Sequence, residues 1–216
     1  MTNSRERGII NKSNKMGAPE SVDFLDYPVS EDLASVESFK KFAAEQLGIE
    51  HIRGIELLKN GNSALEIVKP LKQLMEQYQK RFSQITIMDF GKSKTVAETL
   101  QNELRINSQF ANRPEALAAV LNSWEKSGYI PKGCNNADYV GRHEFFHLLT
   151  QDLINQPKSE IDTVVRRALK NGCEYISKNG QHGNMHEFVA DLLSANELTN
   201  KQSKLKQTVI EIVKRG

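Results

Sequence analysis

Apolar residues recur at helical spacing in several separate stretches before residue 128. The pattern over residues 33–47 is amphipathic and stops at Gly48, a residue that commonly ends helices. A second amphipathic pattern covers residues 65–82 and contains Pro70, where a regular helix starts or kinks. A third opens at a proline and covers residues 114–127. We therefore expect three helical regions before residue 128.

Between these helices, short runs of β-branched and apolar residues predict strands. The runs cover residues 49–58, 85–88 and 104–107. From Ala137 onward the pattern predicts only helices, with a short piece around Tyr175. The predicted helices cover roughly residues 137–153, 158–171, 185–198 and 203–214. Strands in the first half and helices in the second indicate an α+β fold, with a small N-terminal sheet followed by an all-helical half.

The chain has 216 residues, which suits one domain with a short appendage. Residues 1–29 are polar and lack a periodic apolar pattern, so we expect a flexible N-terminal tail. Residues 30–216 are then a single domain. Cys134 and Cys173 are too few for a disulfide framework and are interpreted as two free thiols, although one disulfide stays possible.

Charge and hydropathy exclude several classes of partner. The formal net charge is only +2, which gives no strong signal for nucleic acid or an anionic membrane as the main partner. No apolar run approaches the roughly 18 residues that span a bilayer. The N-terminus also lacks the apolar region of a secretory signal. We expect a cytoplasmic protein, or an effector exported without a cleaved signal; oligomeric state is not predicted.

One motif carries chemistry: residues 143–147 read His-Glu-Phe-Phe-His, the HExxH pattern. Residues four apart project from one face of a helix, so His143 and His147 can converge on one metal ion. Glu144 is rotated by about 100° around the helix axis. Its carboxylate can therefore act on a metal-bound water without binding the metal. The pattern predicts a Zn²⁺ site.

Zinc sites that react with substrate commonly have three protein ligands. Glu187 and Asp191 lie four residues apart on a later predicted helix and share a face. One carboxylate can bind the metal and the other can accept the free N–H of a ligand imidazole. His182, His186 and Asp191 are rival third ligands. Cys134 is too far along the chain from His143 to share one ion if the segment between them is helical.

HExxH followed by a helix with ExxxD resembles the gluzincin metallopeptidases, the thermolysin-like zincins. The resemblance implies a zincin-like fold with His143, His147 and Glu187 as zinc ligands. It also implies Glu144 as general base and Asp191 as the residue that orients His143. In zincins an edge strand binds extended peptide, and residues 104–107 are the candidate for that strand.

The sequence departs from this family after Asp191. Thermolysin-like enzymes place a histidine on a later helix to stabilise the transition state, and no histidine follows Asp191 here. Tyr175 and His182 are the candidates to replace it. The resulting hypothesis is a zinc-dependent endopeptidase, a hydrolase acting on a protein or peptide substrate.

Two alternatives remain open at this stage. One is a zinc-containing, zincin-like structural or binding component of a phage, mobile element or effector system, without proteolytic activity. The other is a helical interaction module in which HExxH arises by chance. Metal content distinguishes the second alternative from the others.

Overall fold

In the part of the chain that the structure describes, the strands fall in the first half, and the regular elements of the second half are helices. The computed structural model describes residues 23–91 and 93–215. The N-terminal part contains α1 (Leu33–Leu47), β1 (Ile52–Arg53), α2 (Asn62–Val68), α3 (Leu71–Tyr78), β2 (Gln84–Met88), β3 (Ala97–Leu100), β4 (Glu103–Asn107), α4 (Ser108–Ala111) and α5 (Pro114–Lys126). The C-terminal part contains α6 (Ala137–Ile154), α7 (Glu160–Lys170), α8 (Lys178–His182), α9 (Met185–Ser194) and α10 (Asn200–Arg215). The α+β prediction is confirmed.

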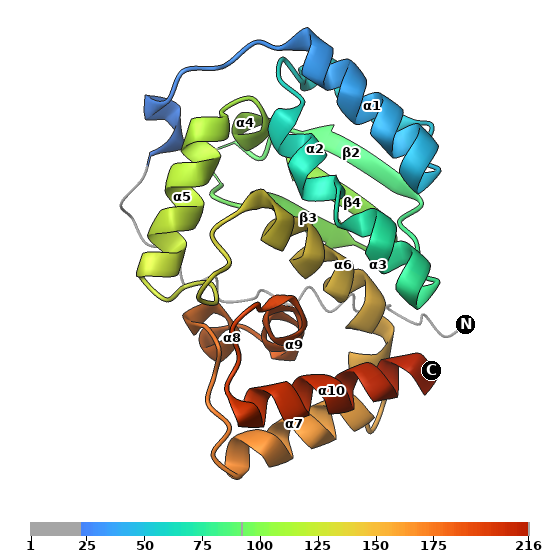
Figure 1. Cartoon of the computed structure of the whole chain (residues 1–216), viewed down its shortest axis with the longest axis vertical. Coiled ribbons are helices and arrows are strands. Elements are labelled where there is room, and N and C mark those ends of the chain that lie inside the picture. Colours follow the sequence, from blue (N-terminus) through green and yellow to red (C-terminus); the bar gives the residue numbers. More distant parts are fainter. Residues whose placement is uncertain (1–22, 92, 216) are drawn as a thin grey trace, which may run out of the picture.

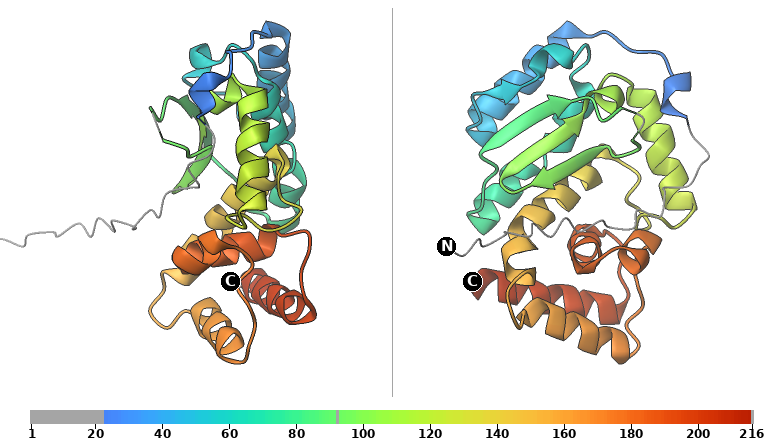
Figure 2. Two further views of the ribbon diagram at one scale, coloured as in Figure 1. Left: turned by 90° about the vertical axis from the view of Figure 1, so that its left-hand side faces the viewer. Right: turned by 180° about the vertical axis from the view of Figure 1, so that it is seen from behind.

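The four strands form one mixed sheet in the order β1-β2-β4-β3. β1 and β4 run parallel to β2, whereas β3 pairs antiparallel with β4. Buried residues alternate with partly exposed ones along β2 and β4, as a sheet covered on one face requires. Among the described residues, the helices of the N-terminal part lie on one face of the sheet and leave the other face uncovered (Figure 2).

Helix α6 connects the two parts of the molecule (Figure 1). Its N-terminal half passes beneath the sheet, where it contacts α2 and β3. Its C-terminal half contacts α7, and α9 packs along it. Phe145 and Leu148 of α6 are fully buried in the common hydrophobic core. The helix that carries HExxH is therefore fixed by both parts.

The strand predicted over residues 49–58 is mostly wrong. Only Ile52 and Arg53 pair with β2, and a 3₁₀ turn, η2 (Ile55–Leu57), follows. Gly54 between them has a φ of 67°, which interrupts the extended chain. Its Cα also lies so close to β2 that a Cβ there would be 2.0 Å from the carbonyl oxygen of Ile87. The β-branched residues of this stretch thus fill the core without forming a long strand.

The expectation that residues 104–107 form an edge strand is also wrong. These residues lie in β4, which has a neighbour on each side. The edges of the sheet are β1 and β3, and β3 is a strand that the sequence pattern did not reveal. Its residues Ala97–Leu100 are partly exposed over most of their length, so they lack the alternation that marks a half-buried strand.

Two smaller differences concern where the predicted tail ends and where one short helix lies. Of the predicted tail, residues 1–22 lie outside the described part, but the 3₁₀ turn η1 (Phe24–Asp26) belongs to the folded structure. Phe24 is buried because its ring packs on Phe110, with the centroids 4.9 Å apart. The helical piece expected around Tyr175 occurs slightly later, as α8.

Candidate metal centre

The two histidines of HExxH lie one turn apart on the buried side of α6. Asn136 starts this helix, and its side-chain oxygen accepts the backbone N–H of Tyr139. His143 is 8% exposed, which places its ring inside the protein. The Nε2 atoms of His143 and His147 are 2.9 Å apart, so both rings direct the same nitrogen to one point.

Glu187 reaches the same point from α9. This helix begins at Asn184, whose side-chain oxygen accepts the backbone N–H groups of His186 and Glu187. The carboxylate of Glu187 lies 3.3 Å from Nε2 of His143 and 3.6 Å from Nε2 of His147. The three possible ligand atoms lie within 4.8 Å of one another. We call His143, His147 and Glu187 the triad.

The spacing of the triad suits a tetrahedral zinc ion. Ligands about 2.0–2.1 Å from a tetrahedral zinc are separated by roughly 3.3 Å. The two imidazole nitrogens are 2.9 Å apart, and the two oxygens of Glu187 lie 3.3 Å from His143 and 3.6 Å from His147, all close to that value. Two imidazoles and one carboxylate are also among the donor sets that zinc takes in proteins. The residues present therefore fit a zinc ion.

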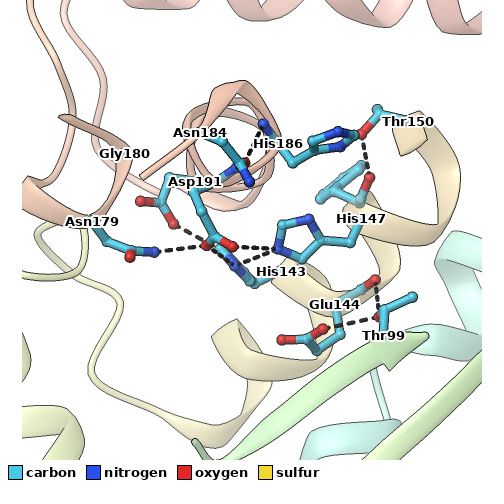
Figure 3. Close-up of polar contacts among 12 residues, drawn as sticks. Thr99, His143, Glu144, His147, Thr150, Asn179, Gly180, Asn184, His186 and Asp191 are labelled. Atoms are coloured by element: carbon cyan, nitrogen blue, oxygen red, sulfur yellow. Dashed lines mark hydrogen bonds and ion pairs between the residues drawn. The ribbon is translucent and has the colours of Figure 1, made fainter. Parts of the chain in front are cut away.

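Asp191 holds His143 in the orientation that this fit requires. Its carboxylate oxygen Oδ1 lies 3.0 Å from Nδ1 of His143, as Figure 3 shows. An Nδ1–H donated to Asp191 leaves the lone pair on Nε2, the nitrogen that faces the triad. Tyr139 and Ser177 also donate their hydroxyl protons to this carboxylate. Asp191 is completely buried, and these donors satisfy its charge.

The charges within the centre depend on one another. Burial alone would raise the pKa of Glu187, but hydrogen bonds and charge from His143 and His147 hold that pKa well below its usual range. Burial opposes the positive charge on His143, yet its bonds to Asp191 and Glu187 outweigh this and raise its pKa well above the ordinary value. Burial, and then the charge of Asp191, raise the pKa of Tyr139. The carboxylates thus make the site strongly attractive to a cation.

Glu144 points away from the triad ligands toward β3. Only 7% of this residue is exposed. The hydroxyl of Thr99 lies 2.9 Å from its carboxylate and 2.8 Å from its backbone carbonyl oxygen (Figure 3). A hydroxyl has a single proton, so Thr99 serves one of these acceptors at a time. The edge strand therefore supports Glu144.

The remaining sequence candidates lie outside the triad. Tyr175 is 44% exposed, and its ring packs edge-to-face on Phe188. His182 is exposed at the end of α8. No hydrogen bond or ion pair within residues 23–91 and 93–215 joins either side chain to the triad. His186 directs its Nε2 to the side-chain oxygen of Asn155, 3.0 Å away.

Several residues of the centre were missed at the level of sequence. They are Thr99, Tyr139, Ser177 and Asn179. Tyr139 had a signal, because it lies one helical turn before His143 on the same face. Thr99 comes from β3, and Ser177 and Asn179 come from the start of α8, so the three have no shared motif. Cys134 and Cys173 are free and buried.

Comparison with known proteins returns a relative of a different kind from the one the motif suggests. The chain is 25% identical over 178 residues to a protein of Dictyostelium discoideum named translation machinery-associated protein 16 homolog. The alignment covers 71% of this chain and 98% of that protein. No protein-family model matches the chain. No solved structure matches it either.

This similarity corrects the functional interpretation of HExxH. The relative is named for the translation machinery and not for proteolysis, so the assignments to gluzincin metallopeptidases and to hydrolases are wrong. The roles of Glu144 as general base and of Tyr175 and His182 as transition-state stabilisers depended on peptide hydrolysis and are dropped with it. Within the described part of the chain, no helix combines the length and apolar character needed to cross a membrane.

Proposed function

We propose that the protein is a zinc-binding protein that works with the translation machinery. The convergence of His143, His147 and Glu187 on one point is the observation that carries the zinc site. The similarity to the Dictyostelium protein supports the association with translation. Its partners are then ribosomal particles or their RNA, and it acts in the compartment where translation takes place.

The centre joins two helices that are distant in sequence. His143 and His147 belong to α6, whereas Glu187 belongs to α9. A zinc ion held by His143, His147 and Glu187 would bring a positive charge, and the carboxylates of Glu187 and Asp191 would neutralise it. The protein residues do the rest: Asp191 fixes the tautomer of His143, and the buried core of α6 keeps both imidazoles in place. Zinc binding thus stabilises the packing of α9 on α6.

Metal content tests the zinc site directly. The purified chain should contain about one zinc per molecule by plasma mass spectrometry. The variant His143→Ala should lose it, because two protein ligands hold zinc far more weakly than three. His51→Ala is the matched control, since His51 is an exposed histidine remote from the triad in the sequence, and it should retain the metal. Zinc at the same level in His143→Ala would refute the site.

Co-sedimentation tests the association with translation. The full chain should pellet with purified ribosomal particles from its own cells through a sucrose cushion, and remain in the supernatant without them. Raising the salt concentration should release it if phosphate contacts contribute. A chain that stays in the supernatant at every salt concentration would contradict this part of the proposal.

A further inference from the structure

The two carboxylates of α9 each receive a hydrogen bond from the same short segment. Ser177 donates its hydroxyl to Oδ2 of Asp191. Asn179 donates its side-chain N–H to Oε2 of Glu187 at 2.8 Å. Glu187 is a member of the triad, and Asp191 orients His143, another member.

The direction of the Ser177 hydrogen bond is fixed by its second partner. The hydroxyl oxygen accepts the backbone N–H of Gly180 at 2.8 Å at the start of α8. Its single proton is therefore free to go to Asp191. The other oxygen of Asp191, Oδ1, faces both His143 and Tyr139. Ser177 thus holds the carboxylate in the plane in which Oδ1 meets the imidazole.

Asn179 acts on the oxygen of Glu187 that is nearest to His143. Oε2 is 3.3 Å from Nε2 of His143, and Oε1 is 3.6 Å from Nε2 of His147. A carboxylate on a long side chain can rotate, and a donor on one oxygen stops that rotation. Glu187 is partly exposed, so without Asn179 its carboxylate would have access to water.

The segment itself is held by the backbone of another part of the molecule. The N–H of Lys178 donates to the carbonyl oxygen of Gly128 at 2.8 Å, and that of Asn179 donates to Tyr129 at 3.1 Å. These bonds fix Ser177–Asn179 to the loop that follows α5. Gly180 brings the segment close to α9, because a Cβ there would lie 3.2 Å from Cα of Phe188. Both donors are therefore supported independently of α9.

We propose that Ser177 and Asn179 are positioning residues that set the zinc affinity of the triad from outside it. Ser177 acts through Asp191 on His143, and Asn179 acts directly on Glu187. The inference rests on the proposed zinc site, which it deepens. Residues that support metal ligands in this way typically change metal affinity by about 10- to 100-fold when they are removed.

The test measures zinc affinity by competition with a chromophoric chelator, using the full chain. Ser177→Ala and Asn179→Ala should each weaken zinc binding by about 10- to 100-fold. Lys178→Ala is the control between them, because this side chain is exposed, and it should change affinity by less than about twofold. Ser177→Thr keeps the hydroxyl and should recover most of the affinity. Wild-type affinity in both alanine variants would overturn the inference.

Two further measurements separate positioning from simple loss of fold. The absorption spectrum of the Co²⁺-loaded protein reports ligand geometry, and it should change in both alanine variants and stay unchanged in Lys178→Ala. Unfolding in excess chelator should show that the metal-free variants remain folded. Loss of affinity that follows loss of metal-free stability, without rescue by Ser177→Thr, would contradict positioning. A wild-type chain that binds no zinc refutes the proposed function, whereas zinc binding unaffected by either variant refutes only this inference.

Discussion

A single missing side chain, at Gly141, allows the metal-binding helix to reach its position. Gly141 lies in α6, two residues before His143. A Cβ at this position would lie 1.8 Å from the carbonyl oxygen of Ile67 in α2. Contacts between carbon and oxygen that short do not occur, so any larger residue would push the two helices apart. Glycine is required here for close packing and not for an unusual backbone angle.

Substitution of Gly141 should therefore reverse the usual effect of helix propensity. In an open helix, glycine to alanine stabilises by up to about 1 kcal/mol. Gly141→Ala should instead destabilise by at least about 1–3 kcal/mol, because α6 and α2 must separate. Urea unfolding followed by circular dichroism measures the difference. A midpoint that rises would show that the two backbones can move apart without cost.

At the same scale, the sequence predicted the triad and Asp191 but not the other residues around them. The spacing of His143 and His147 is local, since four residues make about one helical turn, and a second local spacing pointed to Glu187 and Asp191. That spacing left open which carboxylate faces the metal, and only the resemblance to gluzincins singled out Glu187. Ser177, Asn179 and Thr99 meet the centre only because α8 and β3 pack there. Their positions depend on tertiary contacts, and no local pattern encodes those.

At the scale of the element, the cap of α6 connects helix stability to the metal centre. The side-chain oxygen of Asn136 accepts the backbone N–H of Tyr139 at 2.9 Å. Tyr139 in turn donates its hydroxyl to Asp191 at 2.6 Å. The first turn of α6 thus holds one of the groups that fix the carboxylate beside His143.

Removal of this cap should weaken the whole protein by a modest and measurable amount. Asn136→Ala should lower the free energy of unfolding by about 1 kcal/mol, the usual cost of losing an N-cap side chain. Asn135→Ala is the neighbouring control, because Asn135 does not cap the helix and its side chain only donates to Asn122 at the surface, and it should change stability by less than about 0.5 kcal/mol. Thermal unfolding of both variants beside the wild type checks the difference. Equal melting temperatures in the two variants would exclude a capping role.

Long helices with a periodic apolar pattern were predictable, because such a pattern indicates a helix whichever elements it packs against. The helix over residues 137–153 and the break at Pro70 correspond closely to α6 and to the gap between α2 and α3. The short strands were harder to predict from the sequence. β1 shrinks to two residues beside Gly54, and β3 lacks an alternating pattern, because edge strands bury little on either face.

At the scale of the whole molecule, a sheet with helices on one face is joined to a helical half through α6. The order of strands and helices along the chain was enough to predict this α+β class, because segregated elements pack as separate layers. The zincin-like character of the fold stays a prediction. The activity inferred from HExxH was wrong, since a metal-binding constellation specifies which ion can bind and not the process that uses it.

The triad also spans a long loop, because α7 and α8 lie in the chain between its two helices. Closing such a loop costs chain entropy before any contact between α6 and α9 can form. A zinc ion that needs ligands from both helices can bind all three only after α9 has packed on α6. Zinc should therefore slow unfolding and leave the rate of folding nearly unchanged. Bound zinc would therefore lengthen the lifetime of the folded chain without speeding up its formation.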